Sequence, residues 1–220
     1  MTKDLSPDTD PPRTGRRDPV ASQSDLLQAA ISEFAEHGFE GGRVDRIASA
    51  AGVNKQLLYY YYGSKSDLYR AALEHVYAEI RAAEQELHLG DLPPTEAMRI
   101  LVSFSFDYLE KHPAFLSLIS DENRMAGRHL KGSDKVAEMH SPLIAMIRDT
   151  LDRGIAKGVF HDRFDPVNLY LSIAGLGFFY FANRSTLAII FNRDMTSPAQ
   201  VALRRQHMVD MVLLSLRPDN

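Results

Sequence analysis

Residues 48–62, ASAAGVNKQLLYYYY, decide the fold of this chain. Ala48 and Ala51 are small residues on the apolar face of one short helical segment, and a second short segment follows. Gly52 lies between the two segments, where a tight turn needs a residue that tolerates positive φ. Leu58 supplies an apolar anchor for packing the two helices together. These features are what a helix-turn-helix requires.

Helical periodicity extends in both directions from this stretch. Apolar residues recur at three- and four-residue spacing from Leu26 to Ala35, and again from Leu68 to Ile80. Similar segments continue to about Leu216, without an alternating strand pattern of more than a few residues. We therefore expect an all-α protein of about nine helices, with an N-terminal three-helix domain followed by a C-terminal helical bundle domain.

Several motifs around the turn together resemble the TetR-type (TetR/AcrR-like) transcriptional regulators. They are FAEHGF at residues 34–39, the Ala48 to Val53 turn, and LYYYY at 58–62 followed by Ser64-Lys65. The resemblance is close from Leu26 to about Tyr77. It implies a three-helix DNA-binding domain, a connecting fourth helix, and a C-terminal domain that dimerises and holds a small-molecule effector.

The expected DNA contacts centre on the second short helix. Residues at the start of a recognition helix reach base edges in the major groove. Gln56 can hydrogen-bond an adenine edge, Lys55 a guanine edge or a phosphate, and Leu57 can pack on a thymine methyl. The tyrosines and the lysine that follow resemble the family's phosphate and base contacts. The expected set is Arg43, Asn54, Lys55, Gln56, Leu57, Tyr59, Tyr60, Tyr61 and Lys65.

Two positions depart from the family pattern. Relatives commonly place threonine or serine, as a cap and phosphate ligand, where this chain has Gly42-Arg43, so we expect the charge of Arg43 to reach a phosphate instead. Relatives usually carry a small or polar residue at the Leu57 position, which leaves the operator sequence open. Residues 43–65 contain four basic residues and one acid, a local patch suited to DNA.

Composition excludes several classes of protein. The absence of cysteine rules out a disulfide framework and every Cys-ligated metal site, and the reducing cytoplasm is the natural compartment. A net charge of -4 argues against a protein that coats nucleic acid indiscriminately. The longest apolar run, Leu169 to Ala182, is shorter than the roughly 20 residues of a membrane span, so we expect no membrane association. We expect no cofactor.

The chain divides into three parts. Residues 1–21 are rich in proline and charge and are predicted to be a disordered arm, whose arginines Arg13, Arg16 and Arg17 either contact DNA or are simply solvated. Residues 22–68 are the helix-turn-helix domain. Residues 69–220 are the effector-binding and dimerisation domain, joined to it by a continuous helix from Ser64 to about Leu87.

The second domain is expected to contain an effector pocket and a dimer interface. Aromatic side chains are the expected wall of the pocket and favour a largely apolar effector, although they also suit a core. The helix after Pro166 is apolar almost all round and needs burial on more than one face. The expected pocket residues are Phe104, Tyr108, Phe115, Asn123 and Phe178. The expected dimer residues are Gly175, Phe179, Met208, Met211 and Val212.

Two other functions stay open at this point. A helical enzyme would use His129 or His140 with Glu122 as acid and base, but no recognisable catalytic spacing pairs them. The two histidines do not fit a standard metal-ligand pair, so we expect them to be solvated or to line the effector site and predict no metal site. Residues 121–124, DENR, are expected to line a cavity or to form a wet helix face. The second alternative is an architectural DNA-binding protein without an effector.

The favoured interpretation is a homodimeric, sequence-specific DNA-binding regulator, a repressor in preference to an activator. Its two recognition helices would enter successive major grooves of a palindromic double-stranded operator, about 34 Å apart. A small molecule bound in the second domain would release it. The residues do not identify the effector or the operator.

Overall fold

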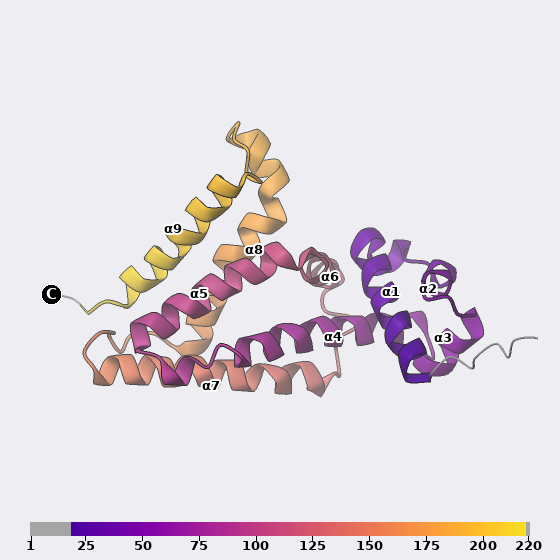
Figure 1. Ribbon diagram of the computed structural model, residues 1–220, viewed down its shortest axis with the longest axis horizontal. Coiled ribbons are helices and arrows are strands. Elements are labelled where there is room, and N and C mark those ends of the chain that lie inside the picture. The colour runs from indigo at the N-terminus through magenta and orange to yellow at the C-terminus, as the bar shows by residue number, and fades with distance from the viewer. Residues whose placement is uncertain (1–18, 219–220) are drawn as a thin grey trace, which may run out of the picture.

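A computed structural model of the chain describes residues 19–218. The molecule is elongated, with a small helical domain at one end and a larger one at the other (Figure 1). The described residues contain nine α-helices, one short 3-10 helix and no strand. The predicted all-α class and the predicted number of helices are therefore confirmed.

The small domain is a three-helix unit with a fourth helix leading out of it. One apolar side chain from each helix lies fully buried at its centre, and burial of such a side chain stabilises the fold by roughly 1.5–3 kcal/mol. These side chains are Leu26, Ile47, Leu58 and Leu68. The helices are α1 (Pro19–Gly41), α2 (Val44–Ala50), α3 (Lys55–Tyr62) and α4 (Lys65–Gln85).

The first helix begins earlier than the sequence predicts. Ser24 is the expected cap, but α1 starts at Pro19, because proline suits a first helical turn. Ser22 is already buried, with 3% of its surface exposed. Residues 19–21 therefore belong to the helix and not to the predicted arm. The three arginines of that arm lie outside the described residues.

Five helices build the larger domain around the far end of α4. A proline occupies the first turn of four of them, where its missing N–H leaves no hydrogen bond unmade. The helix α7 packs along α4, and α6 lies beside the small domain (Figure 1). The elements are η1 (Leu89–Asp91), α5 (Pro94–Lys111), α6 (Pro113–Arg124), α7 (Asp134–Ala156), α8 (Pro166–Ile190) and α9 (Pro198–Leu216).

The helix α8 is longer than its apolar run suggests. Its 25 residues satisfy the length and composition criteria for a membrane-spanning helix, so the expected shortness of the run does not exclude one. One such helix in the described residues is weak evidence for a membrane span. Only 22% of its most apolar window is buried within the chain. The rest of that surface needs another apolar partner.

Asp121 of α6 joins the two domains. Its Oδ2 accepts a hydrogen bond from the backbone N–H of Phe39 at 2.6 Å and one from the Tyr69 hydroxyl at 3.2 Å. Its Oδ1 pairs with Arg124. Gly38 interrupts α1 with φ 67°, and a Cβ atom there would lie 3.1 Å from Oδ1. The end of α1 is thereby fixed to α6.

Glu122 orders the loop that follows α6. Its Oε1 accepts hydrogen bonds from the backbone N–H groups of His129 at 2.6 Å and Leu130 at 3.1 Å, and its Oε2 lies 2.8 Å from His129 Nδ1. The His129 ring in turn packs 4.2 Å from the Phe39 ring, centre to centre. The expectation of a wet face or a cavity lining is therefore wrong for both acids. Each carboxylate is buried and accepts hydrogen bonds from backbone N–H groups.

Replacing Asp121 tests this junction. We expect Asp121→Ala to lower the free energy of unfolding by about 3 kcal/mol, because two buried donors lose their acceptor. Arg124→Ala is the matched control: the Arg124 side chain is 76% exposed, so its loss should cost less than about 1 kcal/mol. Urea denaturation followed by circular dichroism measures both. Equal stability of the two variants would show that Asp121 does not hold the domains together.

Candidate nucleic-acid interface

The helix α3 presents one polar face to solvent. Lys55, Gln56, Tyr59 and Tyr60 are all exposed, and at 3.6 residues per turn they occupy a single arc of about 140°. Tyr60 is 81% exposed. Leu58 lies on the opposite face and is fully buried. The chain therefore leaves this face of the recognition helix open, as a helix that enters a DNA groove requires.

Other predicted contact residues lie at the borders of this face. Asn54 caps α3, since its Oδ1 accepts a hydrogen bond from the Leu57 N–H at 2.8 Å. Leu57 and Tyr61 are half-buried, and the Tyr61 ring packs edge-on against Tyr60. Tyr62 donates its hydroxyl hydrogen to the backbone of α1. Asn54 itself is exposed.

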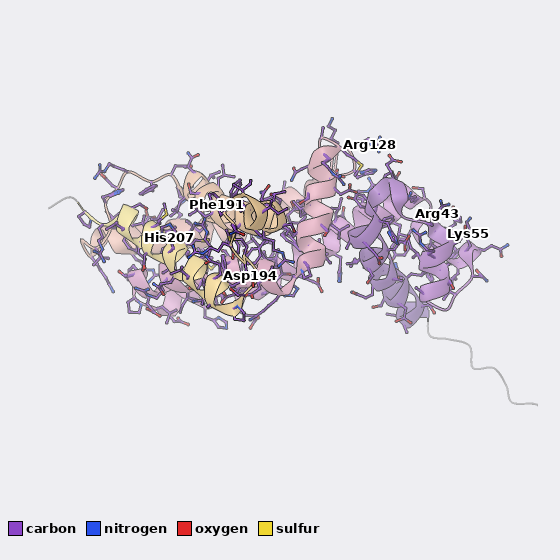
Figure 2. All side chains as sticks on the ribbon, turned by 90° about the horizontal axis from the view of Figure 1, so that it is seen from above. Arg43, Lys55, Arg128, Phe191, Asp194 and His207 are labelled. Atoms are coloured by element: carbon purple, nitrogen blue, oxygen red, sulfur yellow. The ribbon has the colours of Figure 1, made fainter. Side chains whose placement is uncertain are left out.

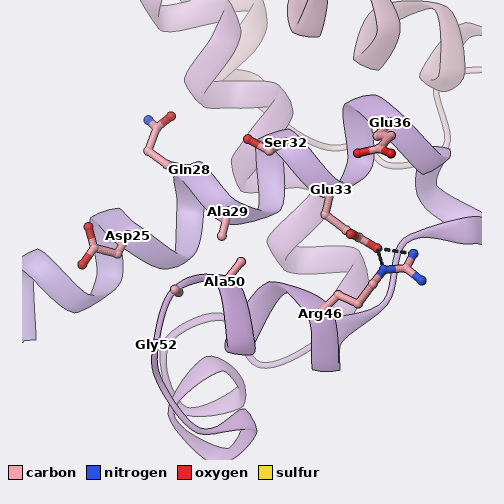
Figure 3. Close-up of a pocket in the computed structure, with 10 residues that line it drawn as sticks. Asp25, Gln28, Ala29, Ser32, Glu33, Glu36, Arg46, Ala50 and Gly52 are labelled. Carbon is pink, nitrogen blue, oxygen red and sulfur yellow. Dashed lines mark hydrogen bonds and ion pairs between the residues drawn. The ribbon is translucent and has the colours of Figure 1, made fainter.

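Two of the four cations in the predicted basic patch are paired with carboxylates. Lys55 Nζ lies 2.9 Å from Asp45 Oδ1, although the lysine stays about half exposed. Arg46 Nε donates to Glu33 Oε1 at 2.7 Å, and this pair lies in a groove between α1 and α2 (Figure 3). The groove contains further acids, including Glu36, so it repels phosphate. It is not the DNA-facing surface.

The other two cations flank the exposed face of α3. Arg43 is exposed, and Figure 2 shows it with Lys55 at the end of the molecule away from the C-terminal domain. Lys65 lies 4.7 Å above the Phe39 ring and 3.4 Å from the Glu40 carbonyl oxygen. These contacts hold Lys65 at the start of α4.

Glu33 replaces the missing cap at the start of α2. Arg43 occupies the cap position without a side-chain hydrogen bond, and its backbone N–H donates to Glu33 Oε1 at 2.8 Å. Partial burial alone would raise the pKa of Glu33, but the hydrogen bonds from Arg46 and Arg43 outweigh it and lower the pKa. The acid lies ten residues before the cap, so no local motif reveals it.

A cavity of about 380 Å³ lies in the larger domain between α4, α5, α6 and α8. Phe115, Asn123 and Phe178 line it, as expected for an effector pocket. Tyr108 is buried in the core beside Phe115, and Phe104 packs against Tyr108. These two therefore lie next to the cavity and not in its wall. Sequence reasoning missed the two charged lining residues, Arg81 and Glu84 of α4, for which no local motif is a signal.

The predicted dimer residues divide into two groups. Gly175, Phe179 and Met211 are exposed on α8 and α9, whereas Met208 and Val212 are buried within the chain itself. Met208 and Val212 lie on the inner side of α9 and pack in the core of the chain itself, so they are not part of the exposed surface. Further exposed apolar side chains extend the same two helices: Val167, Leu171, Leu203 and Leu214.

The histidines do not form a catalytic or metal site. His129 and Glu122 are adjacent but buried at the domain junction, so His129 is neither solvated nor at the cavity. The Nδ1 of His140 donates to the Val136 carbonyl at 2.7 Å. No group of three potential metal ligands occurs in the described part of the chain.

An exposed recognition helix on a three-helix domain, followed by a helical domain with a cavity, defines a helix-turn-helix regulator. Residues 26–72 match the family model "Bacterial regulatory proteins, tetR family". Residues 94–212 match the model "Tetracyclin repressor-like, C-terminal domain". The chain belongs to the tetR family of bacterial regulatory proteins. It is a DNA-binding transcriptional regulator and not an enzyme.

Individual relatives agree with this assignment. The chain is 35% identical over 207 residues to the HTH-type transcriptional repressor NicS of Pseudomonas putida, covering 93% of this chain and 98% of that protein. It is 34% identical over 142 residues to the HTH-type transcriptional repressor SCO4008 of Streptomyces coelicolor, covering 63% and 69%. The crystal structure of the putative transcriptional regulator SCO4942 from Streptomyces coelicolor superposes with a TM-score of 0.65 at 26% identity, covering 90% and 99%.

The cap formed by Glu33 predicts a pH dependence of stability. Because the pKa of Glu33 is lower in the folded chain, its contribution is complete above the unfolded value of about 4.5 and is lost as the pH falls through the folded value. We expect Glu33→Gln to be less stable than wild type at pH 7, and the difference to shrink below pH 4.5. Thermal unfolding measured between pH 3 and pH 7 checks this. A difference that does not change with pH would contradict the role of the charge.

Proposed function

We propose that this protein is a cytoplasmic, homodimeric repressor that a small molecule releases from a palindromic operator. The observation that carries the proposal is the placement of α6. Ile119 and Asn123 on this helix line the cavity, while Asp121 and Glu122 hold the end of α1 and the loop against it. A ligand that displaces α6 therefore acts directly on the DNA-binding domain.

The DNA-reading part of the proposal rests on the open face of α3. Lys55, Gln56, Tyr59 and Tyr60 point away from the core, and Arg43 and Lys65 flank them. In a two-fold dimer, two such faces would enter successive major grooves about 34 Å apart. Gln56 would read a base edge, while the tyrosines and the cations would mainly hold phosphates.

The dimer part of the proposal rests on the apolar surface of α8 and α9. Leu171 and Phe179 on α8 are more than half exposed, as are Leu203 and Leu214 on α9. Exposed apolar patches of this kind mark association sites. A second copy would cover them with the same two helices in a four-helix interface, which also accounts for the low burial of α8 without a membrane.

The effector part of the proposal rests on the cavity and its connection to the DNA-binding domain. A cavity of about 380 Å³ falls in the size range of small-molecule sites, which favours an effector-controlled protein over a purely architectural one. Coupling between two such sites is typically worth 1–3 kcal/mol, or about 5- to 150-fold in operator affinity. An operator affinity that stays constant while a ligand saturates the cavity would refute this mechanism.

Substitutions in α3 and α4 test the DNA contacts. On an operator selected from genomic DNA fragments, we expect Gln56→Ala to reduce discrimination against single-base changes by 1–3 kcal/mol at one position. Tyr60→Ala should weaken binding to all sequences alike, and Lys65→Ala should also lower the salt slope by about 0.9. Fluorescence anisotropy at several salt concentrations measures all three. Arg99→Ala, which removes a partly exposed cation of α5, is the control. Full operator affinity in both Tyr60→Ala and Lys65→Ala would contradict the proposed DNA contacts.

A charge placed in the apolar surface tests the dimer. We expect Phe179→Glu to weaken dimerisation at least about 30-fold, because a carboxylate in the centre of an apolar interface loses its hydration. Operator affinity should fall with it. Ile155→Glu is the control, since Ile155 is 38% exposed on α7 and is not part of the apolar surface of α8 and α9. Light scattering after gel filtration gives the mass of each variant. A dimer that survives Phe179→Glu would place the interface elsewhere.

A further inference from the structure

Two buried charges of α4 lie in the wall of the effector cavity. Arg81 Nη2 and Glu84 Oε1 form an ion pair at 3.0 Å, and the two side chains are only 6% and 4% exposed. The Arg81 guanidinium also lies over the Tyr170 ring of α8, 5.8 Å from its centre. The pair thus sits between the helix that leads to the DNA-binding domain and the helix proposed for the dimer interface.

This ion pair is incompletely satisfied. Arg81 Nε, Arg81 Nη1 and Glu84 Oε2 are buried without a hydrogen-bond partner, and only one other side-chain atom among the described residues shares that condition. Buried charged groups are costly unless they are fully hydrogen-bonded. A hollow of about 30 Å³ that Arg81 and Glu84 also line has room for a water molecule but not for a ligand. A ligand that meets the remaining hydrogen-bonding groups would therefore bind in the larger cavity.

The buried atoms that lack a hydrogen-bond partner favour a ligand rich in acceptors. Arg81 offers two free donor nitrogens, against one free acceptor oxygen on Glu84. Arg81 and Glu84 are also the only lining residues that carry charge in the described part of the chain. Burial raises the pKa of Glu84 to about 7, an effect that Arg81 partly offsets. Near neutral pH the site therefore has a net charge between zero and +1, which suits a single negative charge.

The titratable groups that pack around the pair remain uncharged. Burial raises the pKa of Tyr77 on α4 and of Tyr108 on α5, each to about 12. Burial lowers the pKa of His140 on α7, whose ring packs against Tyr77 and Tyr170. Arg81 is the only cation among the described residues that line the cavity.

The remaining wall fits a flat apolar body. Phe115 of α6, Phe178 of α8 and Ile119 of α6 supply aromatic and aliphatic surface opposite α4. A cavity of about 150 Å³ is enough to hold benzene. The volume of about 380 Å³ therefore accommodates one or two fused rings with a polar substituent.

We propose that the effector is a small aromatic carboxylic acid whose carboxylate accepts a hydrogen bond from one of the two free nitrogens of Arg81, with protonated Glu84 donating to the same carboxylate. This inference rests on the proposed effector function of the cavity and names the chemical class that the cavity selects. The ligand's rings lie against Phe115 and Phe178, and its carboxylate supplies an acceptor that the buried pair lacks. Arg81 supplies specificity for an acid over its neutral analogues.

The role of Glu84 gives the binding a defined pH dependence. A bound anion beside Glu84 favours its protonated form, so binding takes up one proton from solvent. Affinity is then highest below the pKa of the free site, about 7, and falls as the pH rises. Between pH 6 and pH 8 the expected loss is about tenfold, because one proton is coupled to binding. Removing the titrating group should abolish this dependence.

Calorimetric titration of the full-length protein tests the proposal. The probes are benzoate and 1-naphthoate, each compared with its carboxamide. We expect at least one acid to bind wild type at least tenfold more tightly than its amide. Arg81→Met should weaken acid binding at least 30-fold and change amide binding less than threefold. The variant Arg81→Met/Glu84→Gln serves the same purpose if the single variant does not fold, because it leaves no unpaired buried charge.

Two further variants complete the design. Glu84→Gln should bind the acid with the same affinity at pH 6 and pH 8; a tenfold loss that persists in this variant would assign the titration to His140. Ser105→Ala is the control, since the Ser105 hydroxyl already donates to the Leu101 carbonyl and should not affect the ligand. A fall in acid affinity as large as that of Arg81→Met would mean that binding is not specific to Arg81.

The outcomes separate this inference from the proposed function. Amides that bind as tightly as acids, with Arg81→Met unaffected, would overturn the inference, and so would a complete lack of binding by every probe. In either case, release of the operator by a mixture of small metabolites would leave the proposed function standing. Binding of an acid that depends on Arg81 but leaves operator affinity unchanged would support the inference and contradict the proposed function.

Discussion

The hydrogen bonds of the buried Asp121 carboxylate are the constraint on which the rest of this structure depends. A carboxylate with 8% exposure must find donors, and it finds them in the backbone of Phe39 and the hydroxyl of Tyr69. Burial and the neighbouring carboxylate raise the pKa of Tyr69, so its hydroxyl keeps the proton that it donates. Three segments that are far apart in the sequence, the ends of α1, α4 and α6, are thereby held in one arrangement.

This arrangement gives α6 and α4 two roles each. One face of α6 is hydrogen-bonded to the DNA-binding domain through Asp121, and another face lines the cavity. The helix α4 begins beside the recognition helix and carries the Arg81–Glu84 pair four turns later. Both helices are continuous, so in the proposed mechanism a ligand in the cavity would act on the recognition helix through rigid elements. These shared helices would then be the physical basis of regulation.

The larger domain leaves an apolar surface uncovered. Its core is closed by residues such as Met208 and Val212, yet the outward faces of α8 and α9 present apolar side chains to solvent. The helix α8 takes part in both proposed sites, because Tyr170 and Phe178 line the cavity and its exposed apolar side chains would be covered in the proposed dimer. Ligand occupancy and the geometry of a dimer would therefore be linked through one helix.

The sequence by itself determined the helix-turn-helix, the number of helices and the exposed face of α3. These follow from local rules: small residues and glycine at the turn, apolar periodicity, and proline or a capping side chain at helix starts. It also indicated that α8 carries an apolar surface in need of cover, but of the exposed large apolar side chains on that helix it named only Phe179.

Only the tertiary structure decided how the parts are connected. Glu33 caps α2 from ten residues away, and Asp121 meets Phe39 across 82 residues. The sequence predicted aromatic walls for the cavity but not Arg81 and Glu84, because a charged pair three residues apart on a helix is usually solvated. Its burial depends on α5, α7 and α8 closing over α4. Interactions between residues distant in sequence leave no periodic pattern, so the junction and the polar part of the cavity emerged only from the folded chain.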